Sequence, residues 1–106
     1  MKLNPFTREL IQNALAGISD SMIVSVMRTS RSTIVKNNLD FSSSICDSLG
    51  RQTAQGLALP GHLGSTMPAL KGCLDYFGDD IHPGDILASN DPYAGASHLN
   101  DIFMFK

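Results

Sequence analysis

The chain has 106 residues, of which 42% are hydrophobic, and its formal net charge at pH 7 is −2. A chain of this length can form one domain with a modest core and is too short for two. The slight negative charge excludes the basic field on which nucleic-acid binding depends. Four dispersed basic residues are instead expected to line a solvated helix face. They are Arg8, Arg28, Arg31 and Lys36.

The two cysteines, Cys46 and Cys73, provide no disulfide framework, and we expect both to be small buried side chains rather than nucleophiles. The first residues lack a basic segment followed by an apolar core and a cleavage site, so a cytoplasmic protein is expected. Polar residues between Asn13 and Ser25 interrupt the most apolar region. We therefore expect no segment to span a membrane.

The first predicted element is a long N-terminal helix. Asn4 is a suitable N-cap, and Pro5 fits the first helical position. Apolar residues then recur every three or four positions from Leu10 to Met27, which predicts an amphipathic helix. Its apolar stripe has three candidate partners: another layer of the same chain, a missing remainder of the protein, or a partner subunit.

A β-hairpin is predicted beyond Arg31, where the apolar residues no longer follow a helical period. Two short strands are expected on either side of a turn at residues 47–50. Asp40 would lie at the start of the first strand, where its side chain can face a cleft. The following residues, 60–65, are expected to form a loop that contains two glycines and His62.

A second helix is predicted over residues 65–77, with Ser65 as its cap and Pro68 in its first turn. Residues 85–89 then read as a strand that leads into a polar loop, and residues 102–105 as the strand that leaves it. The fold class is therefore α+β. The exposed apolar strand at the end predicts a partner or a larger domain, because such an edge can pair with other chains.

The polar loop, residues 90–101, is the strongest candidate for a functional site. It contains two acids and an imidazole among turn-forming residues: Asp91, His98 and Asp101. Imidazole nitrogen and carboxylate oxygen are ordinary ligands of zinc, manganese and iron. The alternative is that the two acids only cap turns and that the histidine lies at the surface. No glycine-rich phosphate-binding motif is present, so ATP binding by this chain is not expected.

Several short motifs occur along the chain in a characteristic order. They are Leu39-Asp40-Phe41-Ser42, Asp47-Ser48-Leu49-Gly50-Arg51, His62-Leu63-Gly64-Ser65, Pro83-Gly84-Asp85, Asn90-Asp91-Pro92-Tyr93 and His98-Leu99 followed by Asp101. In this order the chain resembles the N-terminal part of the hydantoinase B/oxoprolinase family. The resemblance covers residues 4–106, which correspond to about the first fifth of a typical member of the family.

The resemblance implies one component of an ATP-dependent enzyme that opens cyclic amides such as hydantoins or 5-oxoproline. A hydantoinase A-type partner would handle ATP, and this component would complete the reaction at a divalent metal: zinc, manganese or iron. Carried over to this sequence, the implied metal ligands are Asp40, His98, Asp101 and Asp91. Two further residues, His62 and Asn90, are candidates to line the substrate pocket.

Two other interpretations remain open at the level of sequence. The same family includes subunits that carboxylate ketones, and nothing in these residues separates that reaction from hydrolysis. A further histidine-rich ligand motif of the family would lie beyond residue 106, in the remainder of a B-type polypeptide. A catalytic metal needs about three protein ligands, so the chain by itself is expected to be inactive. It would then be a non-catalytic remnant or an assembly piece that docks on another subunit.

Overall fold

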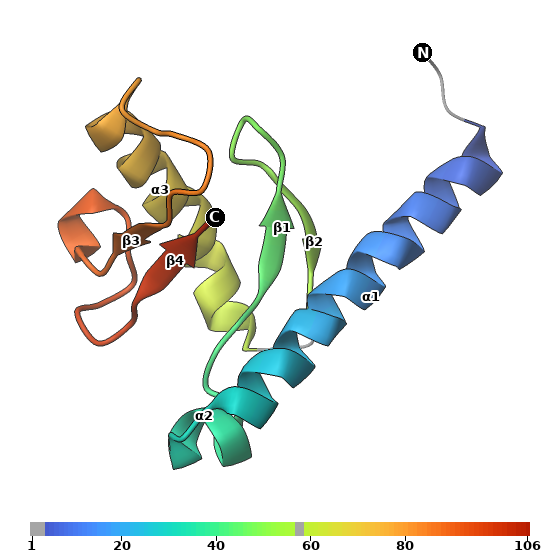
Figure 1. The fold of residues 1–106 in the computed structure, drawn as a ribbon, viewed down its shortest axis with the longest axis horizontal. Coiled ribbons are helices and arrows are strands. Elements are labelled where there is room, and N and C mark those ends of the chain that lie inside the picture. The colour runs from blue at the N-terminus through green and yellow to red at the C-terminus, as the bar shows by residue number, and fades with distance from the viewer. Residues whose placement is uncertain (1–3, 57–58) are drawn as a thin grey trace. The chain divides into compact units, whose positions relative to one another are not determined.

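The computed structural model describes residues 4–56 and 59–106 of the chain. It divides into two compact units, Met1–Pro60 and Gly61–Lys106. Two helices precede a pair of short strands, and a third helix precedes a second pair (Figure 1), which confirms the predicted α+β class. The first unit contains helices α1 and α2 and the strands β1 and β2. The second contains most of helix α3, the strands β3 and β4, and a short 3-10 helix, η1.

Helix α1, Pro5–Thr29, begins where the sequence predicts. The Asn4 side chain accepts a hydrogen bond from the Phe6 backbone N–H at 3.0 Å, and this satisfies one of the unpaired donors of the first turn. The polar residues inside the helix do not interrupt it, because three hydroxyls donate to the carbonyl four residues earlier. These bonds join Ser21 to Gly17, Ser25 to Ser21, and Thr29 to Ser25.

The continuity of α1 corrects the expectation that no segment is long and apolar enough to span a membrane. By length and mean hydropathy, this helix of 25 residues passes that test. Core helices of soluble proteins and signal sequences near an N-terminus pass it too, so length and composition alone do not assign α1 to a membrane.

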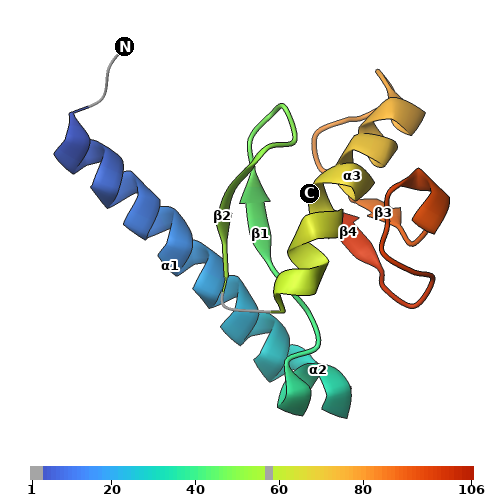
Figure 2. The ribbon, with the colours of Figure 1, turned by 180° about the vertical axis from the view of Figure 1, so that it is seen from behind.

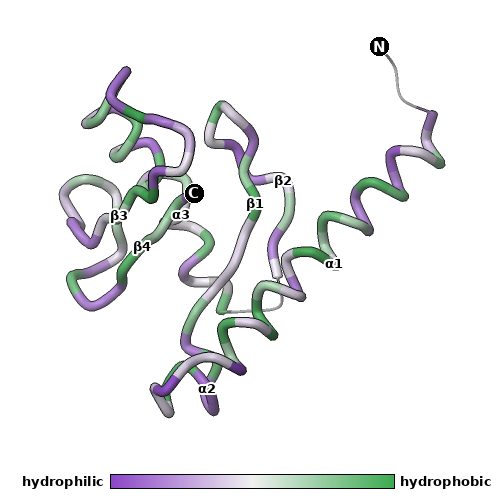
Figure 3. Tube along the Cα trace, viewed as in Figure 1, coloured by the Kyte–Doolittle hydropathy of each residue, from purple (hydrophilic) through white to green (hydrophobic). Residues whose placement is uncertain are grey.

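The predicted apolar stripe of α1 is largely exposed among the described residues. Only Ser19 and Ile23 are buried on this helix. Figure 3 shows hydrophobic residues along much of its length, and the large exposed ones include Phe6, Leu10, Ile11, Ile18, Met22, Val24 and Val26. The prediction of a helix is confirmed. The rest of the first unit, however, covers only a narrow line on it, at Ser19 and Ile23, rather than the full apolar stripe.

That narrow line packs against the end of the hairpin through a close backbone approach. The Ser43 hydroxyl donates to the Ser19 carbonyl at 2.9 Å, and the Gly56 N–H donates to the Ser43 carbonyl at 2.9 Å. A Cβ atom on Gly56 would lie 2.7 Å from the Ser43 Oγ and 2.8 Å from the Ile23 Cγ1. Glycine is therefore required there by space.

Helix α2, Thr33–Asn38, was not predicted, because six residues are too few to show a periodic apolar pattern. It ends at Leu39, which adopts the left-handed conformation with φ of 54°. Asp40 follows in the turn after this helix, and the first strand begins only at Ser44. The prediction that Asp40 starts the strand was therefore wrong by four residues.

The predicted β-hairpin is confirmed. Strand β1, Ser44–Cys46, pairs in antiparallel orientation with β2, Gln52–Gln55. The turn is organised by Asp47, whose carboxylate accepts from the backbone N–H of Leu49 at 3.0 Å and of Arg51 at 2.9 Å. The Arg51 guanidinium also contacts this carboxylate, and these hydrogen bonds lower the pKa of Asp47 below its ordinary value.

Helix α3 spans Pro60–Phe77, and all of it beyond Pro60 belongs to the second unit. The predicted start at residue 65 was wrong, and residues 60–65 are helical rather than a loop. Proline fits the first position of a helix, and neither Gly61 nor Gly64 has the positive φ that a glycine turn uses. Pro68 accordingly lies inside the helix. The predicted end is confirmed, because Gly78 follows with φ of 54° and donates to the Leu74 carbonyl.

The two C-terminal strands are confirmed as a second antiparallel pair. Strand β3, Leu87–Ser89, pairs with β4, Phe103–Phe105, so that Leu87 lies opposite Phe105 and Ser89 opposite Phe103. The segment between them contains η1, Pro92–Ala94. Seen from behind in Figure 2, this segment forms a long excursion from the strand pair. The polar loop therefore leaves and returns at the same end of one hairpin.

Candidate functional site

The polar loop is fixed to α3 by two glycines that allow backbones to touch. A Cβ atom on Gly72 of α3 would overlap the carbonyl oxygen of Ala94. On the loop side, Gly95 has φ of 104°, and its Cβ atom would lie 2.5 Å from the Pro68 carbonyl. The left-handed conformation and the contact both select glycine at this position. The loop therefore packs on the helix at a defined place, its seat, which is formed by the Gly72–Ala94 and Gly95–Pro68 contacts.

Small apolar residues fill the contact beside these glycines. Ala69, Leu70 and Cys73 of α3 are buried, as is Ala96 of the loop. Burial raises the pKa of the Cys73 thiol, and desolvation also raises that of the half-buried Cys46 thiol. A thiol with a raised pKa is a poor nucleophile. The prediction of a buried side chain is confirmed for Cys73, whereas Cys46 is only partly covered.

Two of the predicted site residues shape the loop. The Asp91 carboxylate accepts from the Tyr93 backbone N–H at 2.9 Å and caps η1, as the turn-capping alternative predicted. The Asn90 side-chain amide donates to the Leu99 carbonyl at 3.0 Å, so it ties the start of the loop to its end. Both side chains thereby help to set the position of the residues that follow.

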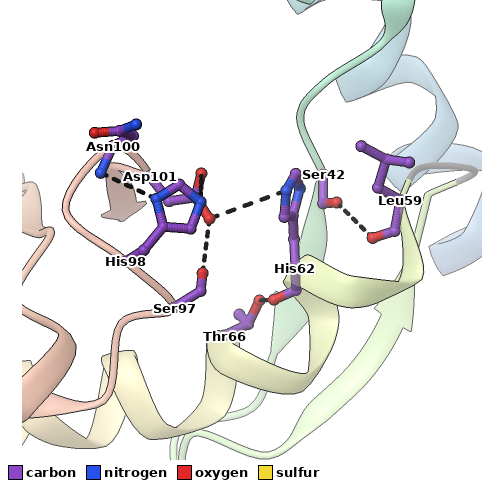
Figure 4. Close-up of polar contacts among 8 residues, drawn as sticks. All are labelled: Ser42, Leu59, His62, Thr66, Ser97, His98, Asn100 and Asp101. Carbon is purple, nitrogen blue, oxygen red and sulfur yellow. Dashed lines mark hydrogen bonds and ion pairs between the residues drawn. The ribbon is translucent and has the colours of Figure 1, made fainter.

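His98 and Asp101 form the chemical centre of the loop (Figure 4). The His98 Nε2 lies 3.3 Å from the Asp101 Oδ1, and the Ser97 hydroxyl donates to the Asp101 Oδ2 at 2.7 Å. The Asp101 side chain is 24% exposed and the His98 side chain 58%. The carboxylate is thus held from one side by a hydroxyl, while the imidazole remains open to solvent.

The His98 ring is oriented through its other nitrogen. Its Nδ1 accepts from the Asn100 backbone N–H at 3.2 Å. Its Nε2 is the nitrogen that lies near the Asp101 carboxylate. A neutral imidazole that bound a cation through Nε2 would carry its proton on Nδ1 and would give up the Asn100 hydrogen bond.

The pair has the chemistry and spacing of two ligands of one metal ion. Two ligands on a tetrahedral zinc ion, each about 2.0–2.1 Å from the metal, lie roughly 3.3–3.4 Å apart. The 3.3 Å between the His98 Nε2 and the Asp101 Oδ1 matches this separation. A strong hydrogen bond between charged groups would be shorter, about 2.7–2.9 Å. The separation of the two atoms is compatible with a shared cation, whose binding to a neutral His98 ring would require the Nδ1 to release the Asn100 hydrogen bond.

The structure adds His62 to this centre. Its Nε2 lies 4.0 Å from the Asp101 Oδ2, and its side chain is 24% exposed. The residue occupies the N-terminal end of α3, where the Thr66 hydroxyl donates to its carbonyl at 3.1 Å. Sequence reasoning placed His62 in a loop and in a substrate pocket without linking it to Asp101. The missing signal was the early start of α3.

The described residues do not complete a metal site by themselves. Within residues 4–56 and 59–106, no group of three or more His, Cys, Asp or Glu side chains could hold a metal ion. His98 and Asp101 belong to the second unit, and Asp40 belongs to the first. Asp91 is engaged at its own turn. The predicted roles of Asp40 and Asp91 as ligands stay predictions.

Comparison with known proteins agrees with the order of motifs. A family model described as hydantoinase B/oxoprolinase matches residues 4–106. Over 104 residues, the chain is 36% identical to the caprolactamase subunit beta of Pseudomonas jessenii, covering 98% of this chain and 18% of that subunit. It is 36% identical over 93 residues to 5-oxoprolinase 1 of Arabidopsis thaliana, covering 88% of this chain and 7% of that protein.

A third relative extends the comparison to fungi. The 5-oxoprolinase of Saccharomyces cerevisiae is 32% identical over 102 residues, which cover 96% of this chain and 8% of that enzyme. No solved structure matches the chain. The chain spans only a small share of the length of each of these relatives. The chain belongs to the hydantoinase B/oxoprolinase family.

Proposed function

We propose that this chain is the N-terminal part of the metal-containing component of an ATP-dependent cyclic-amide hydrolase. The observation that carries the proposal is the His98 and Asp101 pair, whose 3.3 Å separation suits two ligands of one cation. The family match supports the reaction class. Two of the relatives are named as a caprolactamase subunit and a 5-oxoprolinase, and both names denote enzymes that act on cyclic amides.

In this proposal the residues of the loop hold a divalent zinc, manganese or iron ion. Asp101 supplies one oxygen while Ser97 holds the other, and His98 supplies its Nε2. When bound, such a metal would polarise an amide carbonyl or lower the pKa of a water molecule. Asn90 and Asp91 keep the loop in the shape that presents the pair. Asp40 is a candidate further ligand, which an Asp40→Asn variant tests.

The activity requires partners in addition to this chain. The chain spans less than a fifth of the caprolactamase subunit that it matches, so the remaining ligands are proposed to come from the rest of a B-type polypeptide. The name of that relative, a beta subunit, supports a second subunit in such systems. We assign the handling of ATP to a hydantoinase A-type partner.

The names of the relatives favour ring hydrolysis over ketone carboxylation. We would test hydrolysis on the complete B-type protein with its ATP-handling partner, using 5-oxoproline, hydantoin and caprolactam as substrates. His98→Ala is expected to abolish ATP-dependent ring opening. His82→Ala is the matched control, because His82 is exposed and lies 3.7 Å from the Asp85 carboxylate but outside the loop. Equal activity of the two variants would overturn the proposal.

A further inference from the structure

His62 is the third residue at this centre, and the sequence predicted it only as a candidate to line the substrate pocket. Figure 4 shows Asp101 between the His62 and His98 rings. The two carboxylate oxygens are directed differently: Oδ1 lies 3.3 Å from His98, whereas Oδ2 receives the Ser97 hydroxyl and lies 4.0 Å from the His62 Nε2. Oδ1 therefore faces His98, with which it would share the cation, whereas Oδ2 faces Ser97 and His62.

This division matches the way proteins orient a carboxylate that binds a metal. A ligating carboxylate is usually held through its second oxygen by hydrogen bonds, and loss of such a contact weakens metal binding. Ser97 is one such contact. His62 is suited to be the second, because its side chain is three-quarters covered and its backbone is fixed in a helix.

The distance decides what kind of contact His62 makes. A separation of 4.0 Å is longer than a direct hydrogen bond, and one bridging water can span it. His62 faces Oδ2, the carboxylate oxygen that is not assigned to the cation, so its contact acts on the carboxylate.

We propose that His62 is a positioning residue that holds the Asp101 Oδ2 and so keeps the Oδ1 directed at the cation shared with His98. This inference rests on the proposed function, since it concerns the same cation. His62 then contributes to the affinity for the metal without coordinating it. Helix α3 is the element that delivers this contact, and the seat of the loop on that helix sets the distance.

The test uses the complete B-type protein, stripped of metal and titrated with zinc in competition with a chelator. His62→Ala is expected to weaken zinc binding by about 10- to 100-fold while a full equivalent still binds at saturation. His62→Gln retains a side-chain donor and is expected to recover most of that loss. Thermal unfolding of the metal-free variants checks that both remain folded.

Substitution with cobalt separates positioning from coordination. The visible spectrum of the cobalt-loaded His62→Ala protein is expected to keep the band positions and intensity of the wild type, because the set of ligands is unchanged. Unchanged zinc affinity in His62→Ala would overturn the inference alone. Loss of the metal, or an altered cobalt spectrum in both His62 variants, would also overturn it by making His62 a ligand. A wild-type protein that binds no zinc or cobalt would overturn the proposed function as well.

Discussion

Each of the two units contains a close contact between a helix and a neighbouring segment of the same unit. Both contacts depend on glycine. In the first unit, Gly56 approaches α1, and a serine hydroxyl completes the contact by bonding to a helix carbonyl. In the second unit, Gly72 and Gly95 bring the backbone of a loop against the backbone of α3. Only the second contact carries His98 and Asp101. A close contact with a helix backbone can therefore position the residues of a candidate site, as in the second unit, or simply pack a core, as in the first.

The largest effect is expected from Gly95→Ala. The new side chain would meet the Pro68 carbonyl in a left-handed conformation that alanine rarely adopts. Strain and overpacking together are expected to lower the free energy of unfolding by about 3 kcal/mol, measured by urea denaturation of the metal-free complete protein. The variant should also lose metal, because the loop would leave its seat.

Gly64→Ala, in the helix α3 against which the loop packs, is the control for Gly95→Ala. No heavy atom lies within 4 Å of its would-be Cβ atom, and alanine favours a helix by about 1 kcal/mol over glycine. It should leave stability unchanged or raise it slightly. If Gly95→Ala and Gly64→Ala behaved alike, the loop would not be seated as described.

A smaller effect is expected in the first unit from Ser43→Ala. The substitution removes the buried hydrogen bond to the Ser19 carbonyl, which is worth about 1 kcal/mol net. Urea denaturation should show that loss, whereas Ser48→Ala in the exposed hairpin turn should change stability by less than about 0.5 kcal/mol. Metal binding should be retained in both variants. Loss of metal from Ser43→Ala would show that the two contacts do not act separately.

The smallest effect concerns the charge in the hairpin turn. Because the pKa of Asp47 is lowered in the folded state, its contribution to stability is present above the ordinary pKa of 3.8. It is lost as the pH falls through the lower, folded-state pKa. An NMR titration should find the Asp47 pKa below 3.8, and Arg51→Gln should raise it. An unshifted value in the wild type would contradict the role of the turn.

The two units also differ in how much of their fold could be predicted from the sequence. Local signals were sufficient for the start of α1 at Asn4 and Pro5 and for the two hairpins. They failed at α3, because Gly61 and Gly64 are typical of loops, although tertiary packing can override such a preference. They failed at α2 because a single short turn of helix has no pattern of its own.

The site was predictable only where its residues are close in the sequence. His98 and Asp101 are three residues apart, so one loop brings them together whatever else the chain does. The contact between His62 and Asp101 depends on the start of α3 and on the seat formed by Gly72 and Gly95. Positive φ values and backbone contacts of this kind leave no signature beyond the glycine itself.

The most direct test of the candidate metal centre is the metal content of the complete B-type protein, isolated with its partner and measured by elemental analysis. The wild type and the His82→Ala control are expected to hold nearly one equivalent of zinc, manganese or iron, and His98→Ala is expected to lose it, because the variant removes one of the two proposed ligands. Equal metal content in all three proteins, or none in any, would contradict the assignment of His98 and Asp101 as a metal-binding pair.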